Sequence, residues 1–189
     1  MDIEIITKSI FNELSNLSKS DPNERLPKEE QTRSVVFASI RSLYNFVSVE
    51  RGYGSVDVGK RTECDIWAKN LGQTDLWAEI KHGWSLDPGF WNNKPSEQFG
   101  SWIADISKLQ EVPLGSDRYF ILVGFFDFNP SSQQRPEPKS LLDKIRFLYP
   151  QQRIKEESMP FTWPNGPSIA YAGIWIWYWP SGKEIEDFI

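Results

Sequence analysis

Cysteine and histidine are almost absent from this sequence, which has one residue of each, Cys64 and His82, in 189. A single cysteine excludes an internal disulfide bond. One cysteine and one histidine also exclude a zinc site of the usual Cys/His composition. Any metal ion would therefore be held by oxygen ligands, and such ligands favour Mg²⁺ or Mn²⁺.

Long apolar runs are also missing, since none approaches the roughly 20 residues that a membrane-spanning helix requires. The N-terminal residues Met-Asp-Ile-Glu are acidic and lack the pattern of a secretory signal peptide. Together with the lack of cysteine pairs, these absences predict a cytoplasmic protein with no membrane partner.

Positive charge is in deficit, because 21 Lys and Arg stand against 26 Asp and Glu, for a formal net charge of −5. A generally basic surface is excluded, so contact with nucleic acid would need a local basic patch or a metal ion. Aromatic residues, by contrast, make up 14% of the chain and include 9 Trp. This length and composition predict one folded domain over residues 1–189 with a sizeable core.

The most informative pattern lies in residues 63–68 and 76–81, which alternate as half-buried strands do, and residues 69–75 between them suit a hairpin loop. If Asp65 lies opposite Glu79, one register sorts both strands into two faces. The first face comprises Cys64, Ile66, Ala68, Leu76, Ala78 and Ile80. The second comprises Glu63, Asp65, Trp67, Trp77, Glu79 and Lys81. The two acids would lie roughly 5 Å apart at Cβ, which destabilises a sheet unless something such as a divalent cation lies between them.

Helical periodicity predicts an amphipathic helix over residues 1–20 and a second helix over residues 28–47. Glu29 projects onto the centre of the apolar stripe of the second helix, whereas Glu30 points away from it. A glutamate on the buried side of a helix needs a reason, and a functional acid is one. The alternative is an N-terminal acid that the helix dipole favours.

The remaining pattern predicts strands over residues 47–58, 119–128 and 169–179, helices over 96–111 and 139–148, and an irregular segment over 151–167. On the helix over 96–111, Asp105 and Lys108 are one turn apart, and an intrahelical ion pair is the default expectation, with a pocket-lining Lys108 as the alternative. This order of elements predicts an α/β sandwich with a central mixed sheet and residues 1–20 as an N-terminal helical appendage.

An acid on the second strand of a meander, Asp65, and an acid-x-lysine on the third, Glu79-Ile80-Lys81, resemble the motif of the PD-(D/E)XK nuclease superfamily. The resemblance covers roughly residues 28–128 in the order and spacing of elements, and Glu29 matches a glutamate that many members add from the first core helix. Cys64 departs from the pattern, because it stands where the family name has proline. The resemblance implies a restriction-endonuclease-like α/β/α sandwich.

The resemblance also implies metal-dependent hydrolysis of phosphodiester bonds, with DNA expected before RNA. Asp65, Glu79 and the carbonyl of Ile80 would hold Mg²⁺ or Mn²⁺, and Glu29 would join them directly or through water. The ion would polarise the phosphate and lower the pKa of a bound water. Lys81 would orient that water or stabilise charge on the phosphate.

Several alternatives stay open at this point. A salt bridge with Glu63 is a competing explanation for Lys81, and a structural role is the expectation for His82. The whole chain could also be a catalytically inactive nuclease-fold module that binds a protein partner through its aromatic surface. The sequence leaves open whether the protein is a homodimer.

Overall fold

The protein is a mixed α/β structure in a computed structural model that describes residues 3–20, 28–52, 63–84, 95–126, 145, 147–149, 153–162 and 171–185. The helices in these ranges are α1 (Ile3–Ser20), α2 (Glu29–Arg41) and α3 (Pro95–Gln110). The strands are β1 (Phe46–Gly52), β2 (Glu63–Lys69), β3 (Leu76–Trp84), β4 (Asp117–Phe126), β5 (Arg153–Pro160) and β6 (Tyr171–Trp179). Most of the helix expected over 139–148 lies outside the described residues, as does the second half of the strand expected over 47–58.

The strands form one mixed sheet in the order β1-β2-β3-β4-β6-β5. β1, β2 and β3 are an antiparallel meander, and β3 then runs parallel to β4 after the crossover through α3. β6 pairs antiparallel with both β4 and β5. The expected α/β class with a central mixed sheet is confirmed.

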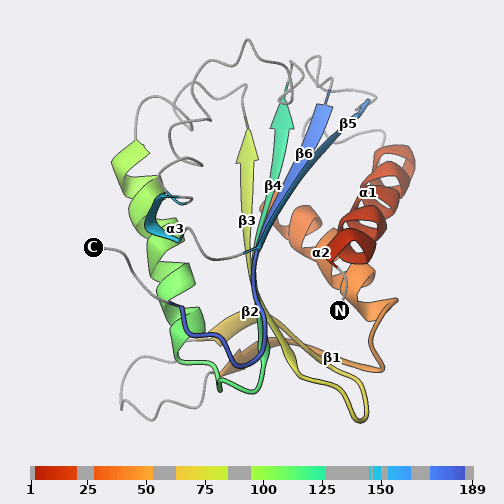
Figure 1. The fold of residues 1–189 in the computed structure, drawn as a ribbon. Coiled ribbons are helices and arrows are strands. Elements are labelled where there is room, and N and C mark those ends of the chain that lie inside the picture. Colours follow the sequence, from red (N-terminus) through yellow and green to blue (C-terminus); the bar gives the residue numbers. More distant parts are fainter. Residues whose placement is uncertain are drawn as a thin grey trace.

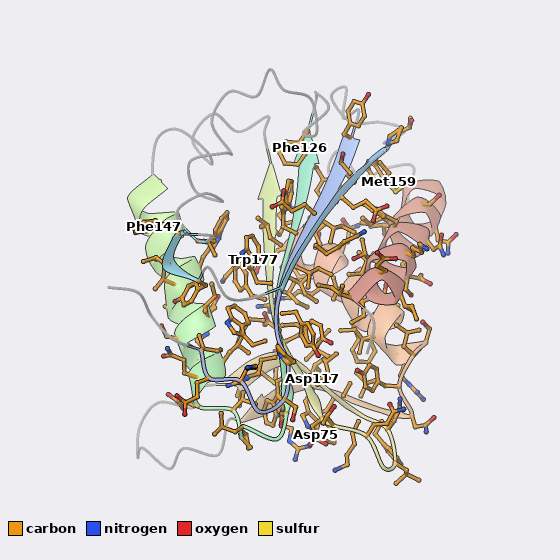
Figure 2. The ribbon with its side chains drawn as sticks, viewed as in Figure 1. Asp75, Asp117, Phe126, Phe147, Met159 and Trp177 are labelled. Carbon is orange, nitrogen blue, oxygen red and sulfur yellow. The ribbon has the colours of Figure 1, made fainter. Side chains whose placement is uncertain are left out.

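The helices cover the two faces of the sheet unequally, as Figure 1 shows: α1 and α2 lie on one side and α3 on the other. On the α1/α2 side the core is largely aliphatic, and α1 contributes Ile6, Ile10 and Leu14 to it. On the α3 side the core is rich in aromatic rings, among them Phe126 and Trp177 (Figure 2). β4 is buried at every position, as its continuous apolar sequence predicts for a central strand.

Residues 153–160 correct the expectation of an irregular segment over 151–167. They form β5, which pairs with β6 from Arg153↔Tyr178 to Pro160↔Tyr171. β5 is an edge strand, and its sequence, Arg-Ile-Lys-Glu-Glu-Ser-Met-Pro, is mostly polar. Charged side chains and a terminal proline are common on sheet edges, and they hide the apolar alternation by which a strand is recognised.

None of the helices in the described part of the chain is both long and apolar enough to cross a membrane.

Candidate functional site

The hairpin of β2 and β3 has the register that its sequence predicts. Ile66 pairs with Ala78, Trp67 with Trp77 and Ala68 with Leu76, which continues to Asp65 opposite Glu79. The paired residues end at Ile66 and Ala78, and a hydrogen bond to a side chain follows them. The backbone N–H of Ile80 donates to Oδ2 of Asp65 at 2.7 Å. The acid-x-lysine of β3 therefore lies beside the acid of β2 at the point where the two strands part.

The expected sorting of faces is wrong at Cys64 and at Asp65, because Asp65 turns toward α2 whereas Glu79 and Lys81 face α3. Ile66 and Ala68 lie in the core of the α1/α2 side, but Cys64 lies in the core of the α3 side. Between these residues the pairing with β1 skips Asp65 and its neighbour Glu50, and Glu50 has a φ of 53°. Left-handed backbone is uncommon outside glycine, and it marks a local irregularity in the meander. The side chains on β2 change face at this irregularity.

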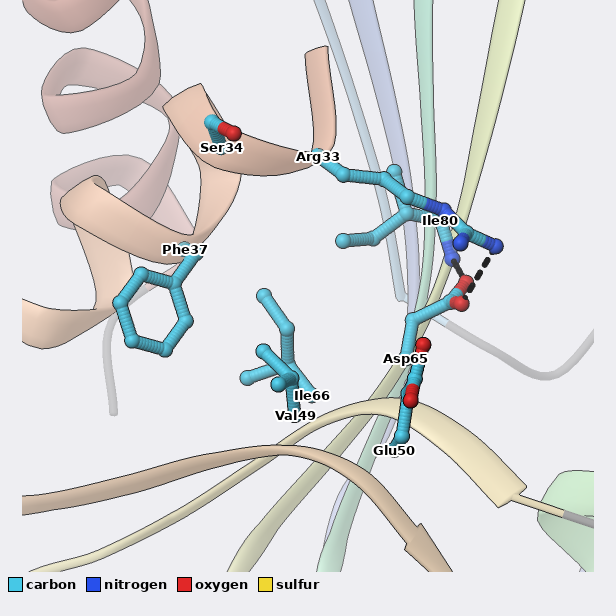
Figure 3. A pocket seen from close by; sticks show the side chains of 8 residues that line it. All are labelled: Arg33, Ser34, Phe37, Val49, Glu50, Asp65, Ile66 and Ile80. Atoms are coloured by element: carbon cyan, nitrogen blue, oxygen red, sulfur yellow. Dashed lines mark hydrogen bonds and ion pairs between the residues drawn. The ribbon is translucent and has the colours of Figure 1, made fainter. Parts of the chain in front are cut away.

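Asp65 turns its carboxylate toward α2, as Figure 3 shows. Nη2 of Arg33 on α2 lies 2.7 Å from Oδ1 of Asp65, and Nε of the same arginine lies 3.7 Å from Oε1 of Glu29. Arg33 is thus the link between two of the acids that the sequence singled out. The sequence patterns did not identify Arg33 as a site residue. Its spacing of four residues from Glu29 is that of a helical ion pair and could have indicated it.

Glu29 is exposed, which corrects the expectation that it lies on the buried stripe of its helix. Its side chain is 55% exposed. The first buried residue of α2 is Thr32, one turn further along the helix. The first turn of α2 therefore lies outside the core. Helical periodicity predicts only the direction in which a side chain points from the helix axis. Burial also requires that another part of the protein packs against that turn of the helix.

A pocket of about 340 Å³ lies beside Asp65 on the α2 side. Its apolar wall includes Phe37, Val49 and Ile66, and its polar wall includes Arg33 and Glu50 (Figure 3). One end of the pocket therefore offers charged groups and the other offers apolar surface. Periodicity did not mark Glu50, whose left-handed backbone cannot be read from sequence.

Glu79 and Lys81 occupy the opposite, α3 side of the sheet. Glu79 is 2% exposed. Nζ of Lys81 lies 2.5 Å from Oδ2 of Asp105 on α3, and Nζ of Lys108 lies 2.5 Å from Oδ1 of the same carboxylate. The expected Asp105–Lys108 pair is confirmed, and Asp105 is a partner of Lys81 that the sequence did not indicate.

The charges of this cluster act on one another. Burial opposes the charged form of Lys108, but the hydrogen bond to Asp105 and the negative charges of Glu79 and Asp65 outweigh it and raise the pKa of Lys108. Burial, reinforced by Glu79, raises the pKa of the Cys64 thiol to about 12. Lys108 is therefore a stable cation, and Asp65 and Glu79 lie within electrostatic reach of the same ammonium group although they approach it from different sides.

His82 faces the α1/α2 side, which supports the structural role expected for it. Its Nδ1 lies 2.7 Å from Oγ1 of Thr32, and its ring packs against that of Phe125. Burial lowers the pKa of His82 to about 4, despite the opposing charge of Glu30. The side chain is neutral at physiological pH and connects β3 to α2.

The donor set of Asp65, Glu79 and the Ile80 carbonyl consists of hard oxygens and fits Mg²⁺ or Mn²⁺. Across the residues that the structure describes, no group of three His, Cys, Asp or Glu gathers closely enough to hold an ion by itself. Mg²⁺ commonly binds through one or two carboxylates and completes its shell with water and substrate phosphates. Two acids and a carbonyl would be enough for such an ion, but Asp65 turns toward α2 and Glu79 lies on the α3 side. Holding one ion together would therefore require at least one of these side chains to turn.

Comparison with protein-family models, with curated proteins and with solved structures finds no match for this chain. Any functional assignment therefore rests on the geometry of its own residues.

Proposed function

We propose that the protein is a metal-dependent nuclease of the PD-(D/E)XK type that hydrolyses phosphodiester bonds, with DNA as the first substrate to test. The observation that carries the proposal is the junction of β2 and β3, where Asp65 and the acid-x-lysine of β3 meet in the predicted register. The antiparallel meander followed by a helical crossover to a parallel strand supports a restriction-endonuclease-like core.

Each side chain has a role that follows from its surroundings. Asp65, Glu79 and the Ile80 carbonyl would hold the ion, which when bound polarises the phosphate and makes its water more acidic. Lys81 would stabilise negative charge that develops on the phosphate, because Asp105 holds its ammonium group in place. Glu29 is exposed and reaches the site through Arg33, so its proposed contact with the ion is through water.

The test is cleavage of plasmid and linear DNA in Mg²⁺ or Mn²⁺ by the wild type and by Asp65→Asn, Glu79→Gln and Lys81→Met. Removing a group that stabilises a transition state typically costs about a hundredfold or more in rate, and we expect losses of that size. Matched controls are Glu157→Gln and Lys155→Met, an ion pair two residues apart on the edge strand β5, which should leave cleavage unchanged. Activity that survives all three site substitutions, or that persists in EDTA, would contradict the proposal.

A non-catalytic module that binds a protein partner is the second candidate. The observation in its favour is that Asp65 and Lys81 already have ion-pair partners, Arg33 and Asp105. Titration of Mn²⁺ into the purified protein separates the two functions. A nuclease binds the ion and loses that binding in Glu79→Gln, whereas a module binds no ion in either form.

A further inference from the structure

Both carboxylate oxygens of Asp65 have partners, and the two partners are of different kinds. Oδ2 accepts the backbone N–H of Ile80 at 2.7 Å, and Oδ1 lies 2.7 Å from the guanidinium of Arg33. The side chain of Asp65 is 12% exposed and that of Arg33 is 44% exposed. A half-exposed cation thus covers a mostly buried carboxylate at the wall of the pocket (Figure 3).

Each carboxylate oxygen of Asp65 keeps a second lone pair, but a divalent ion at Oδ1 would also meet the positive charge of Arg33 2.7 Å away. The energies decide which of the two partners gives way. Ile80 is 1% exposed and fixed in β3, so leaving its N–H without an acceptor costs about 1–3 kcal/mol. An ion pair with a half-exposed arginine is worth only about 0–1 kcal/mol. Arg33 is therefore the partner that yields, and Oδ1 is the oxygen that becomes available.

A displaced Arg33 keeps its charge, because a guanidinium is not deprotonated in proteins. Its side chain lines the pocket beside Asp65. The planar fork of N–H donors that pairs with a carboxylate also pairs with the oxygens of a phosphate. The group that leaves Asp65 is thus suited to bind the substrate.

We propose that Arg33 exchanges partners: it binds Asp65 in the metal-free protein and binds a substrate phosphate when a divalent ion takes Asp65. This rests on the proposed nuclease function and adds a substrate-binding residue from α2. Arg33 then has two effects of opposite sign, since it competes with the ion in the absence of DNA and strengthens the binding of DNA in the presence of the ion.

The test measures both effects on Arg33→Gln, with Arg41→Gln as the matched control. Arg41 lies on the same helix and donates to the backbone carbonyls of Tyr44 and Asn45. Electron paramagnetic resonance of free Mn²⁺, without DNA, should show that Arg33→Gln binds the ion about two- to fivefold more tightly than the wild type. Fluorescence anisotropy with a labelled DNA duplex in Ca²⁺, checked for cleavage on a gel, should show weaker binding and a salt slope smaller by about 0.9.

The outcomes separate this proposal from the nuclease function itself. If Arg33→Gln binds Mn²⁺ no more tightly than the wild type, or keeps the wild-type salt slope, partner exchange is wrong while the nuclease function stands. If the wild type binds neither Mn²⁺ nor DNA, both are overturned. Arg33→Lys sharpens the result, because it keeps the charge but loses the fork, and it should fall between wild type and Arg33→Gln in DNA affinity.

Discussion

The two sides of the sheet hold their charges in different ways near the end of the β2–β3 hairpin. On the α2 side, Glu29, Arg33 and Asp65 form a chain of ion pairs in which the arginine is half exposed. On the α3 side, Lys81 and Lys108, whose side chains are 22% and 32% exposed, converge on Asp105. Exposed pairs are weak and can change partners, whereas a buried carboxylate with two cations is costly to disturb. The α2 side is therefore suited to an arginine that changes partners, and the α3 side to lysines that are held in one position.

The apolar cores on the two sides of the sheet also differ. On the α1/α2 side, aliphatic side chains from two helices fill the core, whereas on the α3 side one helix packs on large rings whose shapes must fit closely. Substitutions on the α3 side should accordingly have the larger effects on stability. Three measurements test this difference between the two sides of the sheet.

The largest effect is expected for Asp105→Ala, which leaves Lys81 and Lys108 without their shared partner. Removing one member of a buried ion pair typically costs about 3 kcal/mol or more in the free energy of unfolding. Urea unfolding followed by tryptophan fluorescence measures this change. Arg33→Gln is the counterpart on the α2 side and should cost less than about 1 kcal/mol. Equal costs for the two substitutions would contradict the contrast between the two sides.

The next effect is expected for Gly173→Ala, on the aromatic side. Gly173 pairs with Gly124, and a Cβ at residue 173 would lie 2.5 Å from Cη2 of Trp175, a residue that is 2% exposed. Overpacking of this kind costs about 2 kcal/mol, and thermal unfolding should show a lower Tm. Gly100→Ala is the control, because nothing lies within 4 Å of its added Cβ and alanine favours a helix. A Gly173→Ala protein as stable as wild type would mean that the rings have room to move.

An effect of similar size, but confined to low pH, is expected for His82 on the α1/α2 side. Its folded pKa of about 4 is below its ordinary value of 6.5, so the unfolded chain binds the proton more readily. The resulting stability is complete above pH 6.5 and is lost as the pH falls through 4. Between pH 7 and pH 5 the wild type should lose about 2 kcal/mol more than His82→Gln. Parallel loss in both proteins would show that His82 does not titrate in this way.

The sequence predicted the structure correctly where the alternation of apolar and polar residues within one strand sets the pairing. The alternation of β2 and β3 predicted the pairing of Ile66 with Ala78, because a slip of one residue would have moved apolar side chains out of the core. It failed at Cys64 and Asp65, which lie on faces opposite to those expected, next to the irregularity at Glu50. It also failed at Glu29, because burial depends on where the neighbouring layer begins.

Local periodicity and composition were enough to predict the order of the core elements, the register of the hairpin and oxygen ligands for any metal ion. The contact of Arg33 with Asp65 and the sharing of Asp105 by Lys81 and Lys108 are known only from the folded structure. These contacts join residues on different elements, and their geometry depends on how α2 and α3 pack on opposite faces of the sheet. The pattern of residues within one helix or strand does not show which residues of another element it will contact.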